Sequence, residues 1–174
     1  MQNQAFQNTS FANHGAVFSH YRNEKGEQND MKFDAAIIID DNRNDLLFHK
    51  MILKKESFAG SFSTFVSGKA AMTYLTKTLK AKIDEDPNTR YAIFLDLIMP
   101  RMDGFDFLDQ FDELDEDFRS HFKVYLVTNS TNPIDLQKAS KSSSVFGFVR
   151  KPITKKLIDV LRFICYRILR TENR

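Results

Sequence analysis

Residues 35–42 read AAIIIDDN, and this stretch decides the fold. Five consecutive apolar residues are typical of a strand that is buried on both faces, and the run ends abruptly in Asp40, Asp41 and Asn42. The same pattern returns at residues 91–96, YAIFLD, where a second apolar run ends in Asp96. Two such runs predict a parallel sheet with polar residues gathered where the strands end.

Helical patterns and further apolar runs extend this repeat along the chain. The remaining strands are expected at residues 62–66, 124–127 and 145–149. The helices are expected at residues 44–56, 72–83, 107–118 (as one helix), from Asn132-Pro133 onward, and 154–169. Each strand is followed by a helix, so we expect an α/β domain, a doubly wound five-stranded parallel sheet flanked by five helices.

The first 31 residues differ in composition from the rest. They are rich in Gln, Asn and Ser and show no sustained period of 2 or 3.6 residues. We therefore predict a disordered extension over residues 1–31 and one domain over residues 32–174. Three phenylalanines, Phe6, Phe11 and Phe18, leave open whether the extension has no specific role or docks on a partner or on the domain.

Composition excludes several classes of protein. Lys and Arg total 25 and Asp and Glu total 23, a net charge of +2 that argues against nucleic-acid binding. One cysteine, Cys165, excludes a disulfide framework and any Cys-rich zinc site. No run approaches the roughly 18 apolar residues of a membrane helix, and no secretory signal is evident. We expect a cytoplasmic protein that does not enter a membrane.

Polar side chains stand at the ends of four of the predicted strands. They are Asp40, Asp41, Asp96, Thr128 and Lys151. Because the carboxyl ends of parallel strands meet at one edge, we expect all of them to face one crevice. Three carboxylates placed together repel one another unless a cation joins them, and oxygen ligands suit a hard ion such as Mg²⁺. A hydroxyl and an ammonium beside them fit phosphoryl chemistry.

Each member of this set has an ordinary interpretation when taken alone. Acids that follow strands often serve as turn or helix-cap residues, and Asn42 and Asp45 fit that role. Thr128 alone could be a turn residue, and Lys151 alone a surface lysine. Three acids, a hydroxyl and a lysine on successive strand ends are hard to explain in that way, and the combination favours a functional site.

Four segments resemble the signatures of the receiver domain of two-component response regulators. They are IIIDDN at 37–42, FLDLIMPRMDG at 94–104, VTNS at 127–130 and FVRKP at 148–152. The resemblance spans about residues 33–165 in the right order. It implies the flavodoxin-like receiver fold, with strand order 2-1-3-4-5. Only one helix and a short tail follow the last strand, so the chain resembles the stand-alone, single-domain receivers.

The resemblance implies a role for each acid. Asp96 would accept a phosphoryl group from a sensor histidine kinase or a phosphotransfer protein. Asp40, Asp41 and Asp96 would hold Mg²⁺, with the backbone carbonyl of Ile98 as a further ligand. The chain would assist its own phosphorylation and dephosphorylation without being a dedicated enzyme.

The resemblance also implies a switch. Thr128 would move to contact the phosphoryl group, Lys151 would pair with it, and Phe148 would turn inward upon activation. The Lys151-Pro152 bond would be cis, as proline permits. The output would be a surface read by a downstream protein that the sequence does not identify, and a homodimer is left open.

Two alternatives and two departures accompany this interpretation. A magnesium-dependent phosphatase of the aspartyl-phosphate type usually needs a second acid two residues after the nucleophile, where this chain has Ile98. A phosphorylation-independent interaction module of the same fold would not need the intact set of acids, Thr128 and Lys151.

Two residues depart from the family pattern. Ile98 is unusually apolar for its position, and we hypothesise that it slows attack by water. Asn129 is larger than the small residue often found there.

Overall fold

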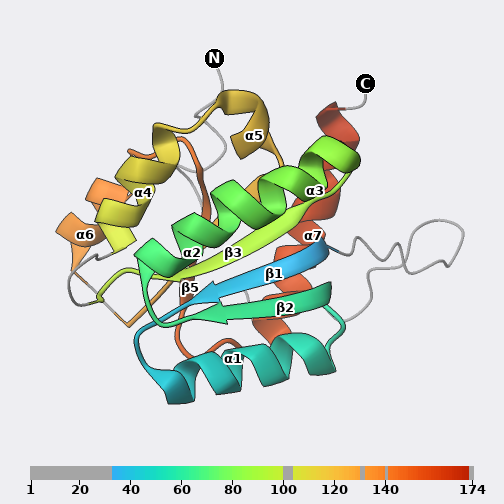
Figure 1. Ribbon diagram of the computed structural model, residues 1–174. Helices are drawn as coiled ribbons and strands as arrows, with labels where there is room; N and C mark the ends of the chain where they lie inside the picture. The colour runs from blue at the N-terminus through green and yellow to red at the C-terminus, as the bar shows by residue number, and fades with distance from the viewer. Residues whose placement is uncertain (1–32, 100–103, 130–131, 140, 173–174) are drawn as a thin grey trace, which may run out of the picture.

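The computed structural model describes residues 33–99, 104–129, 132–139 and 141–172 (Figure 1). The predicted extension over residues 1–31 lies outside them. Five strands form one sheet in the order β2-β1-β3-β4-β5, and every neighbouring pair is parallel. The strands are β1 (Phe33–Ile39), β2 (Ala59–Phe65), β3 (Tyr91–Asp96), β4 (Phe122–Thr128) and β5 (Val145–Arg150). Fold class and strand order are as the sequence predicts.

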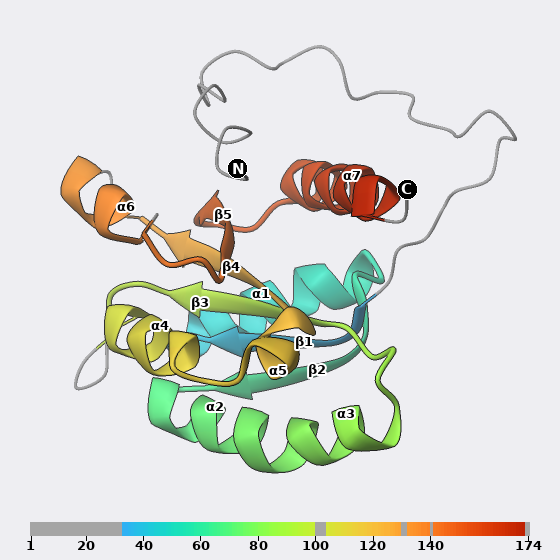
Figure 2. The same ribbon diagram turned by 90° about the horizontal axis from the view of Figure 1, so that it is seen from above.

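Helices cover both faces of this sheet. They are α1 (Arg43–Lys55), α2 (Gly68–Tyr74), the π-helical segment η1 (Leu75–Leu79), α3 (Lys80–Glu85), α4 (Gly104–Asp112), α5 (Glu116–Ser120), α6 (Pro133–Ala139) and α7 (Lys155–Glu172). Figure 1 shows α1 below the sheet and α2 and α3 above it, and Figure 2 places α7 and the α2–α3 segment on opposite sides of the strands. No helix within the described residues is long and apolar enough to cross a membrane.

The core is divided by the sheet into two clusters. One contains buried side chains of β1, β3 and β4 together with Leu75, Leu79, Phe107 and Phe111 from the helices. The other packs the opposite side chains of these strands against α1 and α7. Strands β1 and β3 are buried along almost their whole length, which is why their sequences are continuous apolar runs rather than alternating ones.

One prediction about the helices is wrong. Residues 107–118 were expected to form one helix, but α4 ends at Asp112 and α5 begins at Glu116. The Asp115 side chain accepts a hydrogen bond from Phe118 N at 3.2 Å and so caps a new helix. An aspartate that bonds the backbone in this way competes with continuation of the preceding helix. The apolar stripe continues across the break, since Phe111 and Phe118 are both buried.

The register of the strands brings the polar ends together. Ile39 pairs with Leu95, so Asp40 and Asp96 follow neighbouring positions of β1 and β3. Asp96 pairs with Val127, directly before Thr128. Thr128 in turn pairs with Arg150, directly before Lys151. The predicted crevice therefore lies across the carboxyl ends of β1, β3, β4 and β5.

Candidate functional site

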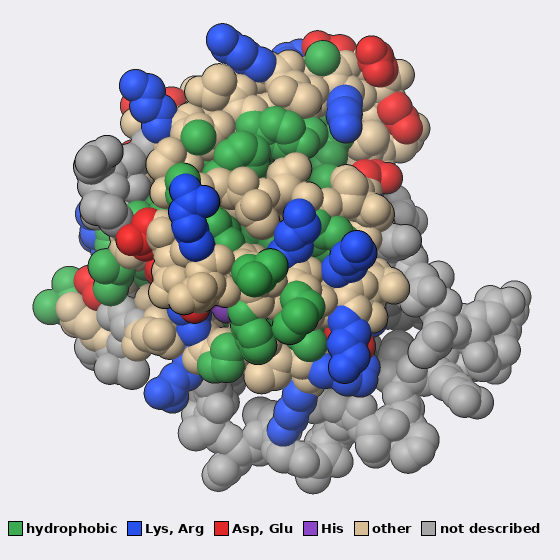
Figure 3. Space-filling view, turned by 60° about the horizontal axis from the view of Figure 1, so that its bottom comes forward, with side chains coloured by type: hydrophobic (Ala, Val, Ile, Leu, Met, Phe, Trp, Pro, Cys, Tyr) green, Lys and Arg blue, Asp and Glu red, His purple; other side chains and the backbone are tan. Residues whose placement is uncertain are grey.

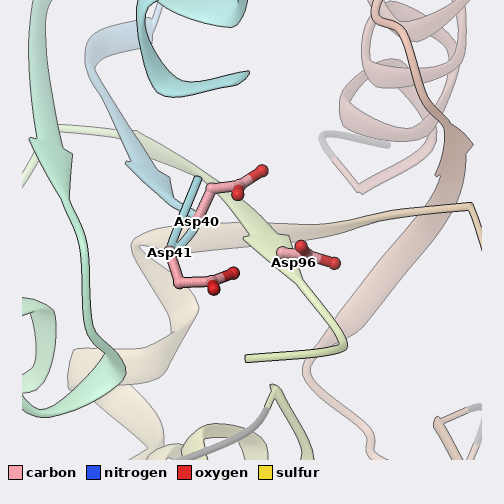
Figure 4. Close-up of side chains that lie close together, drawn as sticks. All are labelled: Asp40, Asp41 and Asp96. Carbon is pink, nitrogen blue, oxygen red and sulfur yellow. The ribbon is translucent and has the colours of Figure 1, made fainter. Parts of the chain in front are cut away.

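Three carboxylates meet at the carboxyl edge of the sheet. Oxygen atoms of Asp40, Asp41 and Asp96 all lie within 4.8 Å of one another. Asp40 and Asp41 follow β1 and Asp96 ends β3, so two adjacent strands place all three side by side (Figure 4). Asp40 and Asp96 are buried, whereas Asp41 is exposed. The cluster is therefore anchored in the core and open to solvent on one side.

Lys151 is the cation of this cluster. Its Nζ lies 2.7 Å from Asp40 Oδ2, 2.8 Å from Asp96 Oδ2 and 3.0 Å from Asp45 Oδ2. The side chain reaches the acids from the loop after β5, where the Lys151-Pro152 bond is cis as predicted. The main chain is tied to β4 by a hydrogen bond from Lys151 N to the Thr128 carbonyl. One ammonium thus serves three carboxylates.

Burial and this contact act on the pKa values in opposite directions. Desolvation raises the pKa of Asp40 above its usual value, although the Lys151 ammonium and the Asn42 N–H partly oppose the shift. Burial alone would lower the pKa of Lys151, but its contacts with Asp40, Asp96 and Asp45 outweigh burial and raise it. Lys151 therefore stays protonated at any physiological pH, and the acids share one permanent positive charge.

The carboxylates fit a hard divalent cation. Asp40 Oδ2 is buried, and the Lys151 ammonium lies 2.7 Å from it. Oxygens bound to one Mg²⁺ at about 2.1 Å lie at most about 4 Å apart. The carboxylate oxygens of the cluster lie within 4.8 Å of one another, close to that value. Exposed Asp41 leaves room for the waters that Mg²⁺ keeps.

The loop after β3 shapes the surroundings of Asp96. Asp96 Oδ1 accepts a hydrogen bond from Ile98 N at 3.2 Å, while Oδ2 contacts Lys151. The Ile98 side chain is 65% exposed and stands at the mouth of the site. Gly104 returns the chain against this loop, and a Cβ there would lie 2.6 Å from the Asp96 carbonyl oxygen. Gly104 therefore sets the position of the backbone beside Asp96. This role was not predicted, although Gly104 is part of the motif at residues 94–104.

The two predicted switch residues flank the same crevice. Thr128 is buried at the end of β4, one strand away from Asp96. Phe148 is half-buried on β5, pairs with Leu126, and packs against the cluster on the α2–α6 side of the sheet. These positions suit a hydroxyl and a ring that respond to a change at Asp96. The predicted movements themselves stay predictions.

Asp45 and His49 were not expected to take part. The sequence pattern favours cap roles for Asn42 and Asp45, and Asn42 indeed caps α1 by accepting hydrogen bonds from Asn44 N and Asp45 N. Asp45, however, turns its carboxylate to Lys151. His49, one helical turn further, is buried, and desolvation lowers its pKa. The separation of 106 residues between Asp45 and Lys151 carries no local sequence signal.

Known proteins are similar to this chain in sequence and fold. The chain matches the family model of the response regulator receiver domain over residues 36–162. A response regulator receiver protein from Dyadobacter fermentans is 25% identical with a TM-score of 0.65, over 76% of this chain and 95% of that one. A two-component response regulator from Cytophaga hutchinsonii is 24% identical with a TM-score of 0.66, over 78% and 98%. A signal receiver domain of a histidine kinase from Syntrophus aciditrophicus is 22% identical with a TM-score of 0.58, over 81% and 93%. No curated protein matches the sequence.

Proposed function

The chain belongs to the response regulator receiver domain family, and from this premise we propose that it is a cytoplasmic signalling module controlled by phosphorylation of Asp96. The donor is a phosphohistidine on a sensor histidine kinase or a phosphotransfer protein. The observation that carries the proposal is the contact of one protonated lysine, Lys151, with the buried pair Asp40 and Asp96.

The transfer exchanges one bond to phosphorus for another. A carboxylate oxygen of Asp96 forms a bond to phosphorus, and the bond between phosphorus and the donor's histidine nitrogen breaks, with its electron pair left on that nitrogen. Lys151 already lies 2.8 Å from Asp96 Oδ2, so its charge is in place for the phosphoryl oxygens. The chain thereby assists its own phosphorylation by positioning rather than by acting as a dedicated enzyme.

Asp40, Asp41 and Asp96, with the carbonyl of Ile98, are the residues that would hold Mg²⁺. When bound, the ion neutralises charge on the phosphoryl oxygens. Asp40 would contribute the buried oxygen Oδ2, which already lies 2.7 Å from the Lys151 ammonium. Asp41 is exposed and would leave the ion accessible to water.

The signal leaves the site through β4 and β5. An aspartyl phosphate adds about −1.5 to −2 charges. The Thr128 hydroxyl moves to a phosphoryl oxygen, and Phe148 on the neighbouring strand turns inward as the space beside Thr128 changes. Their proximity supports this coupling, since Lys151 N bonds the Thr128 carbonyl and Phe148 lies three residues before Lys151. A downstream protein then reads the altered surface of α6 and β5.

A small donor tests the proposal without knowledge of the kinase. The purified chain is incubated with acetyl phosphate and Mg²⁺, and intact-mass spectrometry follows the gain of one phosphoryl group. We expect the gain in the parent chain and in Asp109→Asn, an exposed acid on α4, but not in Asp96→Asn. Chelation of Mg²⁺ abolishes the gain. No gain in the parent chain would contradict the proposal and favour a phosphorylation-independent interaction module.

A further inference from the structure

Helix α1 presents large apolar side chains to solvent. Leu47, Phe48 and Met51 are 68%, 42% and 59% exposed, and they form what we call the α1 patch. The other side of the same helix is buried, because Leu46, His49 and Leu53 are shielded from solvent. Figure 3 shows hydrophobic side chains gathered on the α1 side of the molecule, among Lys and Arg. A contiguous exposed apolar patch of this kind marks a surface that another group covers.

The charges around the patch restrict what can cover it. Helix α1 contains Arg43, Lys50, Lys54 and Lys55, and its one acid, Asp45, is engaged by Lys151. Contact between the α1 patches of two copies would bring these like charges together, which disfavours a second copy as the occupant. A segment with aromatic side chains and no Lys or Arg suits the surface better.

The chain itself contains such a segment. Residues 1–21 have no Asp, Glu, Lys or Arg, and they include the aromatic residues Phe6, Phe11, Phe18 and Tyr21. The first charged residue is Arg22. This stretch can cover apolar surface beside lysines without adding like charge or removing a charged side chain from water.

The chain enters the domain close to α1. The ring of Phe33, the first residue of β1, stacks on Phe58 with centroids 5.3 Å apart. Phe58 N donates a hydrogen bond to the Leu53 carbonyl, near the end of α1. The residues before Phe33 are therefore attached next to the C-terminal end of the helix that presents the patch.

The connecting length is sufficient to reach the patch. Helix α1 has 13 residues and is about 20 Å long, so Leu47 lies less than about 20 Å from the attachment point. Residues 19–32 separate Phe18 from Phe33, and a stretch of 14 residues can span at most about 46 Å. The length of the chain before Phe33 therefore allows Phe18 to contact the patch.

We infer that residues 1–21 dock on the α1 patch through their aromatic side chains. The patch lies on the helix that begins at Arg43, after its N-cap Asn42. The docking does not depend on the proposed function.

A spin label tests the docking in the full chain, without any phosphodonor. A nitroxide is attached at Ser19→Cys in a Cys165→Ser background, and methionine methyl signals are recorded by ¹³C NMR, with Met51 assigned through Met51→Leu. We expect strong broadening of Met51. Met72 serves as the internal control, because it lies on α2 on the other face of the sheet.

Matched variants separate docking from mere tethering. Phe6, Phe11 and Phe18 are replaced together by Ser, and in the control Gln2, Gln4 and Gln7 are replaced by Ser. We expect the Met51 broadening to fall several-fold in the first variant and to persist in the second. Equal broadening in both, or none in the parent chain, overturns the inference. Broadening that arises only between labelled and unlabelled copies also overturns it, in favour of a second copy as occupant.

Acetyl phosphate distinguishes the two proposals. The parent chain and the Phe→Ser variant should gain a phosphoryl group at the same rate, since neither changes the site. If neither chain gains the group while the Met51 broadening behaves as expected, the proposed function fails and the docking stands. If both gain it and Met51 shows no broadening, the docking fails and the proposed function stands.

Discussion

Two lysines four residues apart make similar ion pairs in different surroundings. Lys151 contacts three carboxylates, and its side chain is 10% exposed. Lys155, at the start of α7, contacts Glu56 at 2.8 Å and Asp159 at 3.5 Å, and its side chain is 62% exposed. Lys151 reaches Asp45 in the first turn of α1, and Lys155 reaches Glu56 at the C-cap of the same helix. Only the first is placed where water cannot screen its charge.

The pKa values of Asp40 and Glu56 shift in opposite directions. At the exposed pair, the Lys155 ammonium lowers the pKa of Glu56. At the buried cluster, desolvation dominates and raises the pKa of Asp40 despite a closer lysine. The Lys155 pair connects the C-cap of α1 with the first turn of α7, and only its lysine is well exposed, since the Glu56 side chain is 14% exposed. The Lys151 cluster instead gathers several carboxylates around one ammonium, and this arrangement suits a further cation or a phosphoryl group.

The largest expected effect comes from removing the buried cation. Lys151→Met leaves Asp40 and Asp96 close together without their ammonium, and we expect the free energy of unfolding in EDTA to fall by about 3 kcal/mol. Urea unfolding followed by circular dichroism measures it. Lys155→Met is the matched control and should unfold like the parent chain, because exposed pairs stabilise little. Equal effects of the two substitutions would remove the distinction between the sites.

Added Mg²⁺ should stabilise the buried cluster and leave the exposed pair unaffected. A ligand at ten times its dissociation constant raises the free energy of unfolding by about 1.4 kcal/mol. We expect this rise in the parent chain and in Glu56→Gln, and none in Asp40→Asn, which loses a carboxylate of the cluster. Thermal unfolding with MgCl₂ and with EDTA measures the difference. Stabilisation of Asp40→Asn equal to that of the parent would place the ion elsewhere.

The pH dependence of stability should have opposite signs at the two sites. Asp40 has a raised pKa in the folded chain, so its ionisation opposes folding as pH rises above the ordinary value of 3.8. Glu56 has a lowered pKa, so its contribution is present above 4.5 and is lost as pH falls through the folded value.

In EDTA, Asp40→Asn should therefore gain stability relative to the parent chain as pH rises from about 4, whereas Glu56→Gln should lose it. Urea unfolding at a series of pH values measures both trends. Slopes of the same sign for the two variants would contradict the account of burial given above.

The smallest expected effect concerns the mouth of the buried site. The Ile98 side chain is 65% exposed beside Asp96 and presents an apolar surface to incoming water. Ile98→Asn should shorten the lifetime of the phosphoryl group by about threefold, which is less than 1 kcal/mol in activation free energy. Intact-mass spectrometry after removal of the donor follows the decay. Equal lifetimes would show that Ile98 does not limit the access of water.

Most of the fold could be predicted because its signals are local. Apolar runs such as residues 35–39 and 91–95 identify buried strands, and the acids that follow them identify the edge where the site lies. The break at Asp115 was missed because the apolar stripe from Phe107 to Phe118 continues through it. The spacing of apolar residues predicts which side chains face the core. It does not predict where an aspartate ends one helix and caps the next.

Most residues of the site could be predicted from the sequence, but the contacts between them could not. Asp40, Asp41, Asp96, Thr128 and Lys151 lie at the sheet edge where the strand pattern places them. The third carboxylate on Lys151, that of Asp45, was missed because the pairing joins residues far apart in the chain. Whether an acid after a strand caps a helix or turns to a distant lysine depends on tertiary packing.

Location of the phosphoryl group on the chain tests the central claim most directly. After incubation with acetyl phosphate and Mg²⁺, borohydride reduces an aspartyl phosphate to homoserine, and peptide mass spectrometry identifies the altered residue. We expect homoserine at position 96 and at none of the other acids, Asp40 and Asp41 included. Homoserine at another position, or none in a chain that has gained a phosphoryl group, would contradict the assignment of Asp96 as the acceptor.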